Sequence, residues 1–219
     1  MTDLADRLAS LYDRRSLQHY ARWKVRFDPM YDAVAQRLKD RDAPLIDLGC
    51  GVGLLPFYLR ERGFTAPIIG IDFDRRKIEL AMRAAKRYRG IDFIAGDARH
   101  ELPQGYNIVL LDILHYFDPR SQQQILENVA RAVPREGIVI MRQGLRDGSW
   151  RYRFQKMVDA FARAVRWMKA EHLHYPTREE IAREFHGFDG EIAPLWGGLP
   201  YNNYLFVFRR RASSGITNA

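Results

Sequence analysis

Short apolar runs alternate with amphipathic helical patterns through the middle of the chain. The apolar runs are Leu45–Leu48, Ile68–Ile71, Ile91–Ala95, Ile108–Leu111 and Gly137–Met141. The helical patterns between them are Leu54–Arg62, Arg75–Tyr88 and Ser121–Val133. Strands and helices in alternation predict a parallel sheet with right-handed crossovers. Continuously apolar strands also fit a sheet that helices cover on both faces.

The two ends of the chain carry other patterns. Residues 4–39 have helical spacing, which Asp28-Pro29 interrupts because proline breaks the middle of a helix. After residue 144, apolar residues from Phe154 to Met168 share one face of a long helix, and Thr177 with Glu180 predicts a capping box. Two further strands are expected at Glu191–Leu195 and Tyr204–Arg209.

Composition narrows the class of protein. The 219 residues are 47% hydrophobic and include one cysteine, Cys50, so no internal disulfide is possible. No apolar stretch approaches the roughly 20 residues that span a bilayer, and residues 1–4 do not resemble a signal peptide, which predicts a soluble, cytoplasmic protein. The net charge of +8 favours acidic partners, although the bases are scattered as on an ordinary surface.

The strongest chemical signal is the glycine-rich segment Leu45–Gly53, with the sequence LIDLGCGVG. A buried strand enters a tight turn, and the next helix opens directly after it. Glycines let a backbone approach a ligand closely, and ligands of such sheets bind at the carboxyl ends of the strands. The segment therefore predicts a cofactor site.

Two further strand ends carry carboxylates. Asp72 ends the second strand about 20 residues beyond the turn, where it can accept hydrogen bonds from ribose hydroxyls. Phe73 beside it can pack on an adenine face. Asp97 follows the third strand, where a carboxylate can accept from an exocyclic amine.

Together these motifs resemble those of the class I S-adenosylmethionine-dependent methyltransferases, over roughly residues 40–145. The resemblance implies a Rossmann-like, seven-stranded, mostly parallel sheet with helices on both faces and an N-terminal helical cap. It implies that S-adenosylmethionine is the cofactor, with Asp47 near its methionine end, Gly49 and Gly51 lining it, Asp72 on the ribose, and Asp97 with Ala98 at the adenine. A nicotinamide dehydrogenase fits less well, because Asp47 would lie close to a pyrophosphate.

The segment Val109–Phe117 resembles the fourth-strand motif of the small-molecule branch of this family. The resemblance implies that Asp112 and His115 border both the cofactor and the acceptor. His115 is the candidate catalytic base, since imidazole titrates near neutral pH; the alternative is a residue that only orients its neighbours. His172 and His174 are weaker candidates. The turn at Arg135-Glu136 departs from the family's commoner Pro-Gly-Gly, which should affect the loop more than the activity.

We expect a single domain over residues 1–219. Its parts are a helical cap (1–40), a cofactor-binding core (41–143), an acceptor-side helical insertion (144–190), closing strands (191–211) and a flexible tail (212–219). The run Tyr20–Phe27 is expected to cover the site. No metal is expected, because Arg142-Gln143-Gly144 follows the fifth strand where a metal-dependent catechol enzyme would need acidic or amide ligands.

The insertion is rich in aromatic and basic residues, which fits several acceptors. It could cover a small aromatic or lipid-like molecule, dock an acyl carrier protein, or touch an anionic membrane surface. The N-terminal run Tyr20–Phe27, together with Gly51–Leu55, resembles methyltransferases of bacterial aryl-polyene and related fatty-acid-like pathways. Nucleic acid is a less favoured partner. The alternatives to a small-molecule enzyme are an RNA methyltransferase and a noncatalytic cofactor-binding regulator.

Overall fold

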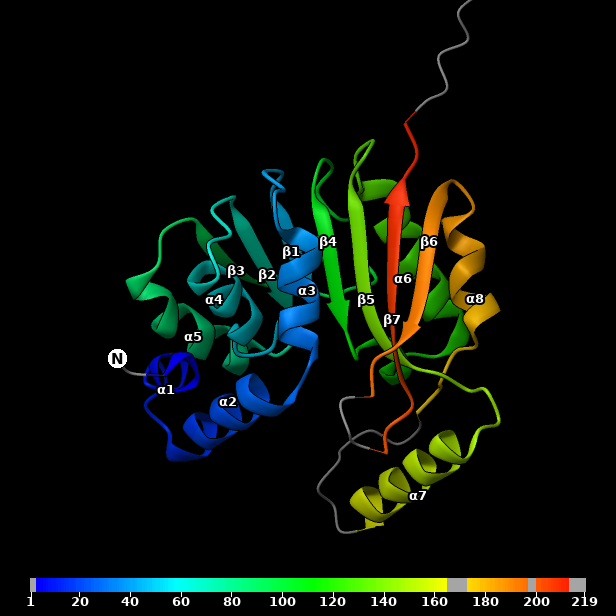
Figure 1. The fold of residues 1–219 in the computed structure, drawn as a ribbon, viewed down its shortest axis with the longest axis horizontal. Coiled ribbons are helices and arrows are strands. Elements are labelled where there is room, and N and C mark those ends of the chain that lie inside the picture. Colours follow the sequence, from blue (N-terminus) through cyan, green and yellow to red (C-terminus); the bar gives the residue numbers. More distant parts are fainter. Residues whose placement is uncertain (1–2, 165–172, 197–199, 213–219) are drawn as a thin grey trace, which may run out of the picture.

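A computed structural model describes residues 3–164, 173–196 and 200–212 of the chain. Seven strands form one sheet in the order β3-β2-β1-β4-β5-β7-β6 (Figure 1). Their bounds are β1 Leu45–Leu48, β2 Ile68–Asp72, β3 Ile91–Ala95, β4 Asn107–Leu111, β5 Ile138–Gly144, β6 Phe188–Pro194 and β7 Asn203–Arg210. Strands β1 to β5 pair in parallel, and β7 runs antiparallel to both β5 and β6. The expected seven-stranded, mostly parallel sheet is confirmed.

Helices precede, connect and follow these strands. The α-helices are α1 Leu4–Ala9, α2 Arg15–Phe27, α3 Met30–Leu38, α4 Leu54–Glu61, α5 Arg75–Ala84, α6 Pro119–Ala132, α7 Trp150–Ala164 and α8 Arg178–Ala182. Short 3₁₀ turns lie at Ala85–Arg87, Leu114–Tyr116 and Arg183–Phe185. In the part of the chain that the structure describes, no helix combines the length and the apolar character that crossing a bilayer requires.

The period of two along each strand divides the core between the two faces of the sheet. Leu45 of β1 and Val109 of β4 belong to a cluster with helices α1 to α5. Ile46, which follows Leu45, and Ile108, which precedes Val109, belong to a second cluster with α6 and α8. The sheet is therefore covered on both faces, as the continuously apolar strands predicted.

Several element ends differ from the expected ones. Strand β5 continues through Arg142 and Gln143 to Gly144, because these polar side chains are buried inside the fold and donate hydrogen bonds there. Strand β6 begins at Phe188, three residues early, since most of this edge strand is exposed and has little apolar signal. The N-terminal helical stretch breaks not only at Asp28-Pro29 but also over residues 10–14.

Three further expectations concern the capping box, the turn at Arg135-Glu136 and the long apolar helix face. Thr177 accepts a hydrogen bond from the Glu180 backbone and the Glu180 side chain accepts from Thr177, so the capping box is confirmed. Glu136 adopts a left-handed conformation (φ 61°), which a glycine of the commoner turn would adopt without strain. The later part of the expected long apolar helix face, including Val165 and Met168, lies outside the described residues.

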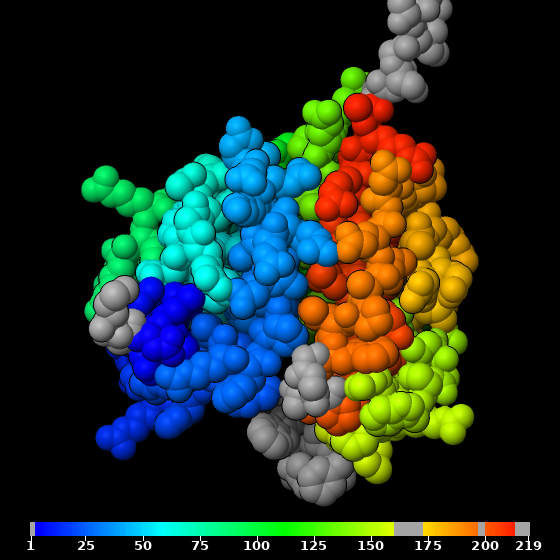
Figure 2. All heavy atoms as spheres, in the orientation of Figure 1, coloured from blue at the N-terminus to red at the C-terminus, as the bar shows by residue number. Residues whose placement is uncertain are grey.

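The arrangement brings two helices to the edge of the sheet where the parallel strands end. In Figure 1 the arrow of β4 runs toward this lower edge, and α2 and α7 lie there on either side. In the space-filling view of Figure 2, the blue N-terminal helices and the yellow-green α7 form the lower left and lower right of the surface. The carboxyl ends of the parallel strands therefore lie at the same edge of the molecule as α2 and α7.

Candidate functional site

The glycine-rich turn fits tightly over the end of β2. The backbone N–H groups of Gly49 and Cys50 both donate to the carbonyl of Ile71, at 2.7 and 3.0 Å. Gly49 has a φ of 82°, and a Cβ there would lie 2.3 Å from Cγ2 of Ile113. Gly51 (φ 58°) is different: no atom lies within 4 Å of a Cβ built there, so its backbone is open to a ligand. Only glycine suits both conformations without strain.

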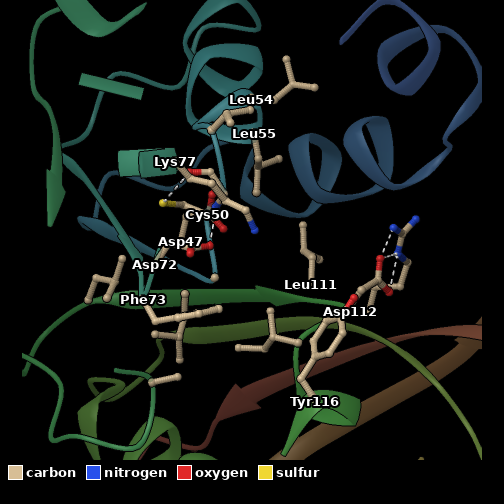
Figure 3. A pocket seen from close by; sticks show the side chains of 18 of the residues that line it. Asp47, Cys50, Leu54, Leu55, Asp72, Phe73, Lys77, Leu111, Asp112 and Tyr116 are labelled. Carbon is tan, nitrogen blue, oxygen red and sulfur yellow. Dashed lines mark hydrogen bonds and ion pairs between the residues drawn. The ribbon is translucent and has the colours of Figure 1, made fainter. Parts of the chain in front are cut away.

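A cavity of about 450 Å³ lies beside this turn (Figure 3). Every cofactor residue expected from the sequence lines it: Asp47, Gly49, Gly51, Asp72, Phe73, Asp97, Ala98 and Asp112. Tyr20 and Lys24 of α2 line it as well, so the N-terminal run reaches the cavity as expected. We call this space the first cavity.

Asp47 is buried in the wall of this cavity, and no basic side chain of the described residues forms an ion pair with it. Its Oδ2 atom has no hydrogen-bond partner among the described residues. Burial raises the pKa of Asp47 to about 8, and the neighbouring Asp72 adds to the rise. A buried carboxylate in this state would be stabilised by a cationic ligand in the cavity, so the donor set fits a positively charged group.

Asp72 is held rigidly at the end of β2, close to Asp47 (Figure 3). Its Oδ2 accepts from the Gly51 N–H and its Oδ1 from the Asp74 N–H, both at 2.9 Å. Each carboxylate oxygen has a second lone pair, so the group can accept further bonds from ligand hydroxyls. Asp74, in turn, caps α5 by accepting from the Arg76 N–H.

The side chains expected to meet an adenine lie at the rim of the first cavity. Phe73 is 78% exposed, which leaves its ring available to a ligand. Asp97 is already paired: its carboxylate accepts hydrogen bonds from Arg99, which lower the pKa of Asp97 to about 2. Asp97 therefore faces the cavity as half of an ion pair.

A second cavity of about 310 Å³ adjoins the first. Lys24, Asp112, Tyr116 and Arg142 line both. Aromatic side chains contribute much of the second wall: Trp23, Tyr116, Tyr175, Trp196 and Tyr201. A molecule in the second cavity would therefore meet one in the first at the four shared residues.

His115 lines the second cavity and not the first. Its ring is stacked on Tyr175, with centroids 5.3 Å apart, and its Nδ1 lies 3.2 Å from Nε2 of Gln143. Burial lowers the pKa of His115, which the charges of Asp112 and Asp159 and the Gln143 bond only partly oppose. The imidazole is thus neutral at neutral pH.

The structure adds residues that the sequence patterns did not single out for the site. Arg142 lies between the two cavities, although its sequence position served only as an argument about metals. Tyr175 and Asp159 come to His115 from the segment after α7 and from α7 itself, where the Tyr175 hydroxyl donates to Asp159 at 2.7 Å. Their aromatic and acidic character gave no signal, because nothing in their spacing relates them to β4.

Cys50 and His174 also have defined surroundings in the structure. Cys50 is buried in the core, and burial raises the pKa of its thiol. The backbone N–H of His174 donates to the carbonyl of His115 at 2.9 Å, whereas His172 lies outside the described residues. Within residues 3–164, 173–196 and 200–212, no group of three or more His, Cys, Asp or Glu side chains is placed to hold a metal ion.

Comparison with known proteins points in one direction. A family model described as a methyltransferase domain matches residues 39–175, more than half of the chain. The chain is 34% identical over 96 residues to a myricetin 3'-O-methyltransferase of Solanum lycopersicum, which is 44% of this chain and 25% of that protein. It is 32% identical over 99 residues to an indole glucosinolate O-methyltransferase of Arabidopsis thaliana, 45% of this chain and 26% of that one.

The similarity to solved structures extends over most of the chain. The magnesium protoporphyrin IX methyltransferase of Synechocystis PCC 6803 with bound SAH superposes with a TM-score of 0.67, covering 93% of this chain and 91% of that one at 16% identity. This level of identity supports the fold alone. The chain spans about a quarter of the length of the two plant relatives.

The buried state of Asp47 predicts a specific dependence of stability on pH. The unfolded carboxyl ionises near 3.8, whereas the folded one stays protonated up to about 8. The contribution of Asp47 to stability should therefore be full below pH 4 and fall as pH rises through this window. Asp47→Asn, which mimics the protonated form, should remove this loss, so its advantage over wild type should grow by up to about 1.4 kcal/mol per pH unit.

Urea unfolding of the unliganded protein at pH 5, 6 and 7 measures this difference. Asp92→Asn, on the exposed side of β3, is the control and should keep the wild-type slope. An advantage of Asp47→Asn that does not change with pH would contradict the assignment of a buried, protonated carboxyl.

Proposed function

Because the chain belongs to the methyltransferase domain family, we propose that it transfers a methyl group from S-adenosylmethionine to a small aromatic acceptor. The class inferred from the glycine-rich turn and the acidic strand ends, an S-adenosylmethionine-dependent methyltransferase, is confirmed by this membership. The observation that carries the finer proposal is the pair of adjoining cavities, one lined by the cofactor motifs and the other by aromatic side chains.

The first cavity fits S-adenosylmethionine, which supplies a methyl group on a positively charged sulfur. Asp47 provides a buried carboxylate with an unpartnered oxygen for the cationic end of the ligand. Gly51 provides open backbone, Gly49 lines the same cavity in the tight turn, and Asp72 provides an oriented carboxylate for the ribose hydroxyls. In this proposal Phe73, with Asp97 and Ala98, contacts the adenine, and Asp112 lies toward the acceptor.

The second cavity fits an aromatic acceptor with a hydroxyl group. Rings of Trp23, Tyr116 and Tyr175 can pack on the faces or edges of such a molecule. The two plant relatives are named for hydroxyl methylation of a flavonoid and of indole glucosinolates, which supports an acceptor of this class. Much of the rate of methyl transfer comes from holding the nucleophile in line with the methyl group, and the shared wall of the cavities would do so.

A free small molecule is the acceptor that these observations favour. An acceptor on an acyl carrier protein, or a lipid-like acceptor at an anionic membrane surface, would instead use the exposed side chains around the same opening, such as Trp23 and Trp150. The aromatic residues inside the second cavity need no such partner.

His115 has two possible roles in this reaction, and Gln143 distinguishes them. If the Gln143 amide donates to Nδ1, the imidazole proton lies on Nε2, and His115 orients the acceptor by donating to it. If the amide is turned over from its orientation in the structure, where its Nε2 also donates to the carbonyl of Gly144 at 3.2 Å, its oxygen faces a protonated Nδ1. Nε2 of His115 is then free to remove the proton of the acceptor hydroxyl. We propose the second role, general base, because a phenol with a pKa near 10 is protonated at neutral pH.

The assigned cofactor site can be tested by calorimetry with S-adenosylhomocysteine. Wild type should bind it and should not bind nicotinamide dinucleotides. Asp72→Ala removes a charged hydrogen-bond acceptor and should weaken binding by roughly 1.5–3 kcal/mol. Asp92→Ala, on the exposed side of the adjacent strand, should bind as wild type does. Equal affinity of Asp72→Ala and wild type would refute the ribose assignment.

The role of His115 can be tested by the dependence of kcat on pH with a hydroxylated aromatic acceptor. As a base, His115 should give an acidic limb below pH 6.5, because burial lowers its pKa. His115→Ala should lower kcat by about 10²–10⁴ and abolish this limb, while cofactor affinity stays nearly unchanged. The exposed His186→Ala is the control. An acidic limb that persists in His115→Ala would assign His115 the orienting role.

A further inference from the structure

Arg142 of β5 lies at the boundary between the two cavities and binds two carboxylates. Its side chain is 5% exposed. Its Nε atom donates to both carboxylate oxygens of Asp112, at 3.0 and 2.9 Å, and Nη2 also contacts Asp112. The third nitrogen, Nη1, donates to Oδ1 of Asp28 at 2.5 Å. The planar guanidinium thus uses all three of its nitrogens on two separate groups.

The two carboxylates come from distant parts of the fold. Asp112 follows β4 and has a left-handed backbone (φ 57°), an uncommon conformation for a residue that is not glycine. Asp28 follows α2, accepts from the Lys24 ammonium at 2.8 Å, and holds the start of α3 by accepting from the Met30 N–H at 3.1 Å. Arg142 therefore joins the junction of α2 and α3 to the end of β4.

The charges of this group are balanced within the chain. Burial alone would raise the pKa of Asp28, but the positive charges of Arg142 and Lys24 outweigh it and lower this pKa. Burial would likewise lower the pKa of Arg142, and the charges of Asp112 and Asp28 outweigh that. Removing one partner would leave a buried charge without its counterion, which costs far more than breaking an exposed pair.

The other ion pairs of α2 do not reach the sheet. Arg22 binds Asp6, and Arg26 binds Asp3 and Asp6, so these three pairs link α2 to α1 and its N-cap residue. Yet α2 contributes Tyr20 and Lys24 to the first cavity. The Asp28–Arg142 contact is thus placed to determine where α2 lies relative to the cavity.

We propose that Arg142 is a positioning residue that couples the N-terminal helix α2 to the Asp112 carboxylate at the boundary between the cavities. Bridging by Arg142 keeps α2 over the first cavity and at the same time aims Asp112 between cofactor and acceptor. A ligand that binds in the first cavity then also orders α2. This role in the reaction rests on the proposed function, whereas the coupling itself does not.

Asp28→Asn tests the coupling. The amide retains an oxygen for the Met30 N–H, so α3 keeps its start, but the charge that Arg142 binds is lost. Hydrogen exchange of peptides from Arg15–Phe27 should become about tenfold faster or more in the unliganded variant, and S-adenosylhomocysteine should bind about tenfold more weakly. Arg26→Gln breaks an exposed ion pair of the same helix and should leave both quantities within about twofold of wild type.

A second variant tests the coupling even if Asp28→Asn fails to fold. Arg142→Lys retains the buried positive charge, but one ammonium cannot replace the two-sided guanidinium, so α2 should again exchange faster. In wild type, S-adenosylhomocysteine should slow exchange both in α2 and near Asp112. In Asp28→Asn the slowing near Asp112 should remain while that in α2 is lost.

The outcomes separate this proposal from the proposed function. Exchange in α2 and ligand affinity both unchanged in Asp28→Asn would overturn the coupling, and so would an Arg26→Gln effect as large as that of Asp28→Asn. A wild-type protein that does not bind S-adenosylhomocysteine would instead overturn the proposed cofactor site. The exchange comparison of unliganded variants would still decide whether Arg142 holds α2.

Discussion

The site depends on two buried carboxylates, Asp47 and Asp72, which the parallel sheet brings together at the ends of β1 and β2. No ion pair joins either to a base in the described part of the chain. The fold places them there because both strands run in the same direction, with Asp47 opposite Gly70 and Leu48 opposite Ile71. Such a pair is unfavourable in the empty protein, and a ligand with a positive charge relieves it. The proposed preference for a cationic ligand thus rests on where the topology places these two carboxylates.

The acidic strand ends on either side differ from this central pair. Asp97 after β3 is paired with Arg99, and Asp112 after β4 is paired with Arg142. Among the described residues, the flanking carboxylates are therefore paired with arginines, whereas the two central ones are not, although Lys77 lines the same cavity. In the proposed function, the cationic part of the ligand lies over β1 and β2, and Asp112 lies at the boundary with the aromatic second cavity.

Much of the fold and the first cavity could be predicted from the sequence, because their signals are local. Strands such as Leu45–Leu48 are continuously apolar, and Asp72 lies a fixed distance beyond the glycine turn. The second cavity could not, because Tyr175 and Asp159 meet His115 only through tertiary packing. Arg142 was missed for a related reason. A charged residue within a strand looks like the end of that strand until its buried partners, Asp28 and Asp112, are known.

The most direct test of this account is a count of the protons exchanged when S-adenosylmethionine binds. Calorimetric titrations at pH 7 in buffers of different ionisation enthalpy give this number. If the Asp47 carboxyl is protonated in the empty site, with its pKa raised to about 8, and ionises beside the cationic ligand, wild type should release a proton that Asp47→Asn does not. The same proton count in both proteins would contradict the claim that a buried, uncompensated Asp47 organises the site.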